Sequence, residues 1–178
     1  EGKVYNNTIG STTAYSGAPA GSYPISVDAR NTSTITAHIR GNTLRHADGG
    51  VEVGGGQGSS KVNLTITGNR ILDPEAATAL AGIYANSGIL NSDSSCMTIQ
   101  IGGLTGYPGS PSATESEIQN QIEGSWPSAS IRVIKSFGGS PPDPVFNLPS
   151  YDGSAVNAWM AARNTFVSPG TTVSNNAG

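Results

Sequence analysis

Three short stretches of this sequence share one template: VYNNTIG at Val4–Gly10, IRGNTLR at Ile39–Arg45 and ITGNRIL at Ile66–Leu72. In each copy an apolar residue is followed three positions later by asparagine, and two positions after that by another apolar residue. A looser copy, IQNQIE, lies at Ile118–Glu123. A template that recurs along one chain is typical of repeat proteins, in which each repeat is one unit of secondary structure.

Short segments of alternating polarity flank the copies. One set precedes them and comprises Ile35/Ala37/Ile39, Val62/Leu64/Ile66 and Met97/Ile99/Ile101. Another set follows them and comprises Ile25/Val27, Val51/Val53, Ile83/Ala85 and Ile131/Val133. Because alternation with a period of two indicates a β-strand, each unit is expected to hold about three short strands.

No single unit can bury its apolar residues alone, but units stacked at the strand spacing of roughly 4.8 Å would form a continuous core. The sequence therefore predicts an all-β solenoid with parallel sheets. The alternative is an antiparallel sandwich with hairpin turns such as Asp48-Gly49. That turn recurs nowhere in register, and a sandwich leaves the repeated asparagine unexplained.

The repeated asparagines are expected to stack at one corner, where side-chain amides can bond to one another and to the backbone of the turns. This predicted ladder consists of Asn7, Asn42, Asn69 and Asn120. We expect solenoid rungs with corner-loop insertions over residues 1–137. Residues 138–178 are expected to form a Gly/Pro-rich segment, a helix at about 153–164 and a tail. The apolar positions Val156, Trp159 and Met160 would let this helix cap the last rung.

Composition excludes several classes of protein. Ile and Val together outnumber Leu by 24 to 7, Gly occurs 24 times, and only 12% of residues are charged, so an all-α fold is excluded. The net charge of −3, with no basic cluster, argues against nucleic acid as a partner. No apolar run approaches the roughly 20 residues that span a bilayer, so we expect no membrane insertion. With Cys96 alone and only two histidines, His38 and His46, we expect no metal ion and no cofactor.

The best candidate for a ligand-binding surface lies on the strands that follow the template. Their outward positions on successive rungs would be Ser26, Glu52, Tyr84 and Arg132. If these align, Glu52, Tyr84 and Arg132 form an exposed stripe of an acid, an aromatic ring and a base. Ordinary surface polarity is the alternative interpretation of the stripe. The remaining acidic residues are scattered, so we assign no catalytic residue.

The later part of the chain resembles a known group of proteins. The segments CMTIQIGG (Cys96–Gly103), SIRVIKSF (Ser130–Phe137) and FNLPSYDGSAVNAWMAARNTF (Phe146–Phe166) look like the closing section of very large bacterial surface proteins that carry right-handed parallel β-helix repeats. Leu148–Gly153 resembles their Leu-Pro-Gly-Tyr-x-Gly element, with Ser150 in place of the first glycine. The resemblance implies a right-handed parallel β-helix, a cell-surface or extracellular location and an adhesin-like role.

Three functions follow as hypotheses. The leading one is a non-enzymatic structural or adhesive module that is secreted or displayed at the cell surface. The second is a polysaccharide-binding or polysaccharide-degrading domain, with a polysaccharide or cell-surface glycan as its partner. The third is a fibre subunit that associates end to end through its rung edges. Asn6, Asn31 and Asn63 stand in Asn-x-Ser/Thr triplets, which we interpret as chance in a chain rich in Asn and Thr.

Overall fold

The computed structural model describes residues 1–75, 80–88, 93–103, 118–135, 145–147, 156–167 and 173–176. In this part of the chain the fold is all-β apart from one short helix, and the strands of each sheet pair in parallel. The antiparallel sandwich is therefore excluded as the arrangement of these strands. No helix among the described residues is both long and apolar enough to cross a membrane.

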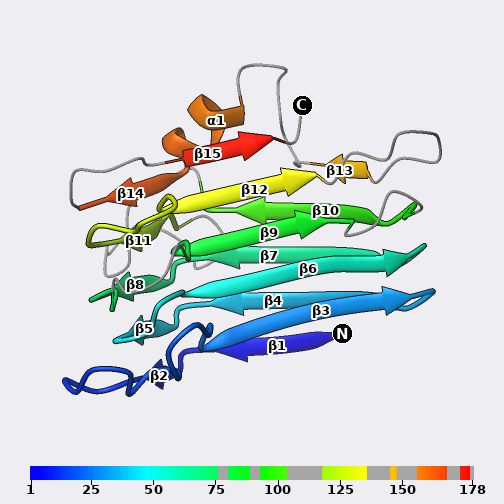
Figure 1. Cartoon of the computed structure of the whole chain (residues 1–178). Coiled ribbons are helices and arrows are strands. Elements are labelled where there is room, and N and C mark those ends of the chain that lie inside the picture. Colours follow the sequence, from blue (N-terminus) through cyan, green and yellow to red (C-terminus); the bar gives the residue numbers. More distant parts are fainter. Residues whose placement is uncertain are drawn as a thin grey trace.

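The strands belong to three five-stranded sheets, and each sheet takes every third strand of the chain (Figure 1). The first sheet contains β1 (Gly2–Tyr5), β4 (Thr34–Arg40), β7 (Lys61–Thr67), β10 (Cys96–Ile101) and β13 (Val145–Asn147). The second contains β2 (Thr8–Ile9), β5 (Thr43–Arg45), β8 (Arg70–Leu72), β11 (Asn120–Ile122) and β14 (Asn164–Phe166). The third contains β3 (Ile25–Asn31), β6 (Val51–Gly58), β9 (Ile83–Ser87), β12 (Ile131–Lys135) and β15 (Val173–Asn176).

Three consecutive strands thus contribute one strand to each sheet, and we call such a group a layer. The layers follow one another in chain order, from β1–β3 near the N-terminus to β13–β15 near the C-terminus (Figure 1). Residues at equivalent positions of adjacent layers are neighbours across the parallel ladder. A side chain on one strand is consequently surrounded by the residues that occupy the same position in the layers on either side.

The core consists of apolar residues in register. Ile39, Ile66 and Ile101 are paired across β4, β7 and β10, and all three are fully buried. Alternation along each strand places every second residue inside, as in the pattern of β10, because successive side chains of a strand point to opposite faces. The alternating strands predicted from the sequence are confirmed.

The end of the chain differs from the prediction. No strand is predicted from the sequence beyond residue 137, whereas β13, β14 and β15 each extend one sheet. Each of these strands has only three or four residues, too few to display a clear alternation. These segments form strands because their backbone groups find hydrogen-bond partners in the preceding layer. The sequence pattern does not indicate this pairing.

The helix α1 (Val156–Ala162) lies within the region predicted to be helical. Trp159 and Met160 are buried, Val156 is half-buried, and the Arg163 guanidinium lies 4.4 Å from the centre of the Trp159 ring. The chain then continues from the helix into β14 and β15, both of which α1 contacts. The helix therefore lies between β13 and β14 in the chain and contacts two strands of the last layer. Residues 153–155 of the predicted helix and the Leu148–Gly153 element lie outside the described residues.

Candidate functional site

Two columns of side chains cross the layers, and the first is the asparagine ladder. The Nδ2 atom of Asn7 donates to Oδ1 of Asn42 (3.1 Å), that of Asn42 to Asn69 (2.9 Å), and that of Asn69 to Asn120 (3.0 Å). The structure therefore brings together the four asparagines predicted from the template. It adds a fifth, because Asn120 donates to Oδ1 of Asn164 (2.9 Å).

The ladder also satisfies the backbone of the turns between the first and second sheets. Nδ2 of Asn69 donates to the carbonyl oxygen of Ile39 (2.9 Å), and Oδ1 of Asn69 accepts from the backbone N–H of Asn42 (3.0 Å). Asn42, Asn69 and Asn120 are fully buried. Because a buried polar group without a partner is costly, these amides have a structural role.

The residue before each ladder asparagine adopts a left-handed backbone conformation at three successive corners. These residues are Asn6 (φ 55°), Gly41 (φ 64°) and Gly68 (φ 64°). Glycine takes this conformation without strain, and asparagine tolerates it better than most residues do. This requirement explains why the template reads Asn-Asn or Gly-Asn at the corner.

The second column lies on the outward face of the third sheet. Ser26 pairs with Glu52, Glu52 with Tyr84, and Tyr84 with Arg132, in the parallel registers of β3, β6, β9 and β12. The alignment predicted from the sequence is therefore present. All four alternate with buried or half-buried apolar residues along their strands, as in the burial patterns of β3 and β9, so they point away from the core.

Contacts tie the members of this column to one another. The Ser26 hydroxyl donates to Oε2 of Glu52 (2.9 Å), and the Arg132 guanidinium lies 5.9 Å from the centre of the Tyr84 ring. Burial raises the pKa of the Tyr84 phenol; Arg132 lowers it, and Glu52 raises it further. Tyr84 is therefore a neutral aromatic surface at ordinary pH, with a cation on one side and a carboxylate on the other.

Tyr23 is a further member of the site, which the stripe predicted from the sequence does not contain. Its ring stacks on that of Tyr84, with the ring centres 6.3 Å apart and 20° between their planes, and its hydroxyl accepts from the backbone N–H of Ala81 (3.4 Å). Burial raises the pKa of Tyr23 to about 12, and Glu52 and Tyr84 raise it while Ala81 and Arg132 lower it. A Cβ added at Gly49 would clash with the Tyr23 ring, so the absence of a side chain there makes room for the tyrosine.

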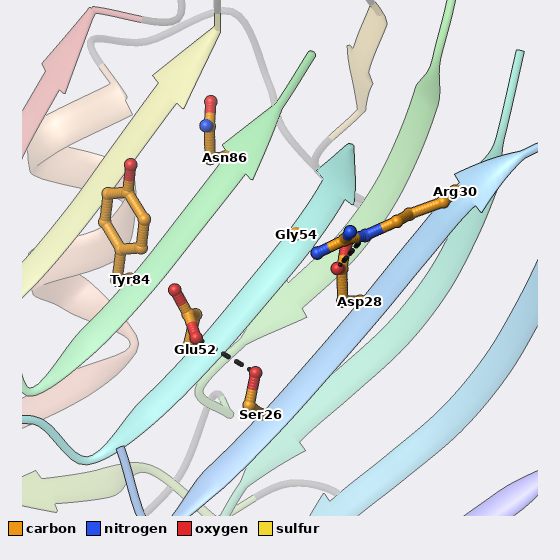
Figure 2. Close-up of a pocket in the computed structure, with 7 residues that line it drawn as sticks. All are labelled: Ser26, Asp28, Arg30, Glu52, Gly54, Tyr84 and Asn86. Carbon is orange, nitrogen blue, oxygen red and sulfur yellow. Dashed lines mark hydrogen bonds and ion pairs between the residues drawn. The ribbon is translucent and has the colours of Figure 1, made fainter. Parts of the chain in front are cut away.

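The column borders a depression of about 250 Å³ in the outward face of the third sheet (Figure 2). It is lined by Ser26, Asp28, Arg30, Glu52, Gly54, Tyr84 and Asn86. Nε of Arg30 donates to Oδ2 of Asp28 at 2.6 Å. Within the part of the chain described, the Oδ1 atom of Asn86 is buried and accepts no hydrogen bond.

Four of these lining residues, namely Asp28, Arg30, Gly54 and Asn86, were not predicted from the sequence, although a signal exists. Asp28 and Arg30 stand two and four positions after Ser26, and Asn86 stands two positions after Tyr84. Alternation places such residues on the same face, so extending the predicted stripe along each strand would have found them. Gly54 stands two positions after Glu52 and leaves space between Asp28 and Asn86, its partners in the flanking strands.

The two histidines lie outside this depression. His46 is bonded through Nδ1 to Oε1 of Glu75 (2.7 Å), and its Nε2 lies 3.6 Å from Oδ2 of Asp73. Nε2 of His38 lies 3.4 Å from Oε1 of Glu1. Across the described ranges, no group of three or more His, Cys, Asp or Glu residues has an arrangement that could hold a metal ion.

The arrangement on the third sheet is suited to binding. It combines aromatic rings, two carboxylates, two guanidinium groups, a hydroxyl and an amide on a rigid sheet, and such convergent polar groups give a ligand its orientation. Each carboxylate already has a different partner, Ser26 for Glu52 and Arg30 for Asp28. Comparison of the chain with protein-family models, curated proteins and solved structures gave no match.

Proposed function

We propose that this protein is a non-enzymatic structural and adhesive module, extracellular or at a cell surface, and that it binds a saccharide on the outward face of its third sheet. We further propose that its three sheets form a right-handed parallel β-helix. What supports the helix is that consecutive strands pass from sheet to sheet while each sheet takes every third strand in parallel. The resemblance to bacterial surface proteins supports the location and the handedness.

The observation that carries the binding function is the in-register column of unlike residues beside the depression. Ser26, Glu52, Tyr84 and Arg132 come from four successive layers, and a sheet holds them with little freedom to rearrange. Hydroxyl-rich ligands need both donors and acceptors, which Ser, Asn, Arg and carboxylate side chains supply. Aromatic rings add apolar contact area with little loss of conformational entropy.

A panel of immobilised neutral, acidic and amino polysaccharides tests this function. We expect the wild-type protein to bind at least one of them and Tyr84→Ala to reduce that binding at least about tenfold, which corresponds to about 1.4 kcal/mol. The matched control is Tyr5→Ala on the first sheet, because Tyr5 pairs in register with Arg40 and lies 5.7 Å below its guanidinium. The control variant should bind as the wild type does.

Three outcomes would contradict the proposal. Binding that survives Tyr84→Ala but is lost in Tyr5→Ala would move the site to the first sheet. Release of new reducing or unsaturated ends from a polysaccharide, abolished by Glu52→Gln, would make the protein an enzyme. Absence of binding across the whole panel would leave no adhesive role for this face.

A further inference from the structure

The charges around the depression are unequal, and this indicates the class of ligand. Its lining carries two carboxylates, Asp28 and Glu52, and one guanidinium, that of Arg30. Arg30 is committed to Asp28 through an ion pair of 2.6 Å. Glu52 accepts a hydrogen bond from the neutral Ser26, and among the described side chains no basic nitrogen lies within ion-pair distance of it.

Arg132 does not neutralise Glu52, for a reason set by the sheet. In the strand order β12 and β6 lie on opposite sides of β9, so Tyr84 on β9 stands between the two charges. The Arg132 guanidinium is held over the Tyr84 ring. Arg132 also does not line the depression. The depression therefore presents one carboxylate that lacks a cation.

The aromatic residues beside Glu52 are neutral at ordinary pH, because burial raises the pKa of both phenols, so they do not offset its charge. Glu52 and Arg132 act on both phenols with opposite sign, because Arg132 lowers each pKa and Glu52 raises it. Tyr23 and Tyr84 stack next to Glu52, and the Tyr84 ring, whose face attracts cations, already has the Arg132 guanidinium 5.9 Å from its centre. Glu52 is therefore the group left to pair with a cation of the ligand. An ammonium group placed here would meet the Glu52 carboxylate, and a charge-assisted hydrogen bond is roughly twice as strong as a neutral one.

We propose that this depression binds the protonated amino group of an amino sugar, with Glu52 as its anionic partner, in preference to neutral or acidic sugars. This inference rests on the proposed saccharide-binding function. The cavity of about 250 Å³ is smaller than the roughly 300–1,000 Å³ of sites for drug-sized ligands, so it takes one sugar unit of a longer chain. Ser26, Asp28 and Asn86 supply polar groups for the hydroxyls of that unit.

Calorimetric titration with three oligosaccharides of equal length tests the inference: one of glucosamine, one of N-acetylglucosamine and one of galacturonic acid. We expect the glucosamine oligomer to bind at least about tenfold more tightly than the acetylated one, and the difference to shrink as salt is added. Glu52→Gln should abolish the difference. The control Glu123→Gln should preserve it, because Glu123 follows β11 of the second sheet and pairs with Arg70 (3.7 Å).

The outcomes separate the inference from the function on which it rests. Equal or tighter binding of the acetylated or acidic oligomer, still lost in Tyr84→Ala, would overturn the preference for an amino group and leave saccharide binding intact. A lysine oligopeptide that binds as tightly as the glucosamine oligomer would overturn the sugar as the ligand class. Failure of all three oligosaccharides to bind would overturn both proposals.

Discussion

The asparagine ladder is one column of side chains in this protein, and Ser26, Glu52, Tyr84 and Arg132 on the third sheet form the other, which we call the Glu52 column. Both are built by the parallel register of the strands, but they differ in role. Both place one side chain from each layer above the next, at the corner in one case and on the third sheet in the other. The ladder repeats one residue type and its central members are fully buried. The column uses a different residue in each layer and is partly exposed. Repetition therefore marks what holds the layers together, and variation marks what is free to recognise a ligand.

The physical reason lies in hydrogen-bonding demands. A buried amide must satisfy its donors and acceptor within the protein, and the neighbouring asparagine offers the complementary groups at the layer spacing. A residue on the outward face can form its hydrogen bonds with water instead. Its identity is then open to selection by a ligand.

If a central ladder residue could be removed without loss of stability, the ladder would not have the structural role that distinguishes it from the column. Asn69→Ala removes an amide that donates to Ile39 and Asn120 and accepts from Asn42. Because several buried groups lose their partners, we expect the free energy of unfolding to fall by about 3 kcal/mol. Chemical denaturation followed by circular dichroism measures this loss.

The control for this change is Asn7→Ala at the exposed end of the ladder. Asn7 donates to Asn42, but its side chain is exposed, so water can replace the lost bond and we expect a loss of about 1 kcal/mol. Equal losses for the two variants would mean that stacking in a buried corner does not give the ladder its strength.

A second substitution tests whether the stacking of Tyr23 on Tyr84 depends on packing between layers. Gly49→Ala places a methyl group where the Tyr23 ring lies, and we expect overpacking to cost about 1–3 kcal/mol. Displaced towards solvent, Tyr23 should lose much of the burial that raises its pKa to about 12. Titration of phenolate absorbance should show its pKa moving back towards 10.0; an unchanged value would contradict the role of Gly49.

Alkaline pH should affect the site on the third sheet and not the ladder, because Tyr23 and Tyr84 are titratable and the asparagines are not. The pKa of Tyr23 is about 12 in the folded protein against an ordinary value of 10.0. Its contribution to stability is therefore fully present below pH 10 and is lost as the pH rises towards 12. Denaturation midpoints across this range should fall less steeply in Tyr23→Phe. Identical slopes would show that Tyr23 ionises as easily in the folded chain as in the unfolded one.

The smallest effect is expected at the centre of the column. Glu52→Gln keeps the shape of the side chain and its contact with Ser26, so the free energy of unfolding should change by less than about 0.5 kcal/mol. Binding of the glucosamine oligomer should nevertheless weaken. A stability loss as large as that of Asn69→Ala would make Glu52 a structural residue like those of the ladder.

Much of the fold was predictable because the repeats reveal, along the sequence alone, which residues occupy equivalent positions in successive layers. The template places Asn42 and Asn69 at equivalent points, and alternation places Glu52 and Tyr84 on one face. The extension to Asn164 was not predicted, although Asn164 and Phe166 keep the second half of the template. The residue three positions before Asn164, Ala161, lies in α1 and not in a strand, so this copy lacks the strand that precedes the asparagine in the first three copies.

The site was only partly predictable for a different reason. Tyr23 reaches the site by stacking across layers on Tyr84, and no periodic pattern links a residue just before one strand to the middle of another. Its placement depends on Gly49, because a side chain there would clash with the Tyr23 ring. This requirement can be recognised only once the layers are stacked. The pairing of Arg30 with Asp28, which leaves Glu52 without a cation, likewise depends on side-chain geometry.

The division between a binding column and a structural ladder is tested most directly by nuclear magnetic resonance. Titrating the isotopically labelled 18.1 kDa chain with the glucosamine oligomer should shift the backbone amide signals of Glu52, Tyr84 and Asn86 most strongly. The signals of Asn42 and Asn69 should remain in place. Shifts centred on the ladder or on the first sheet, or no shifts at saturating ligand, would contradict the account.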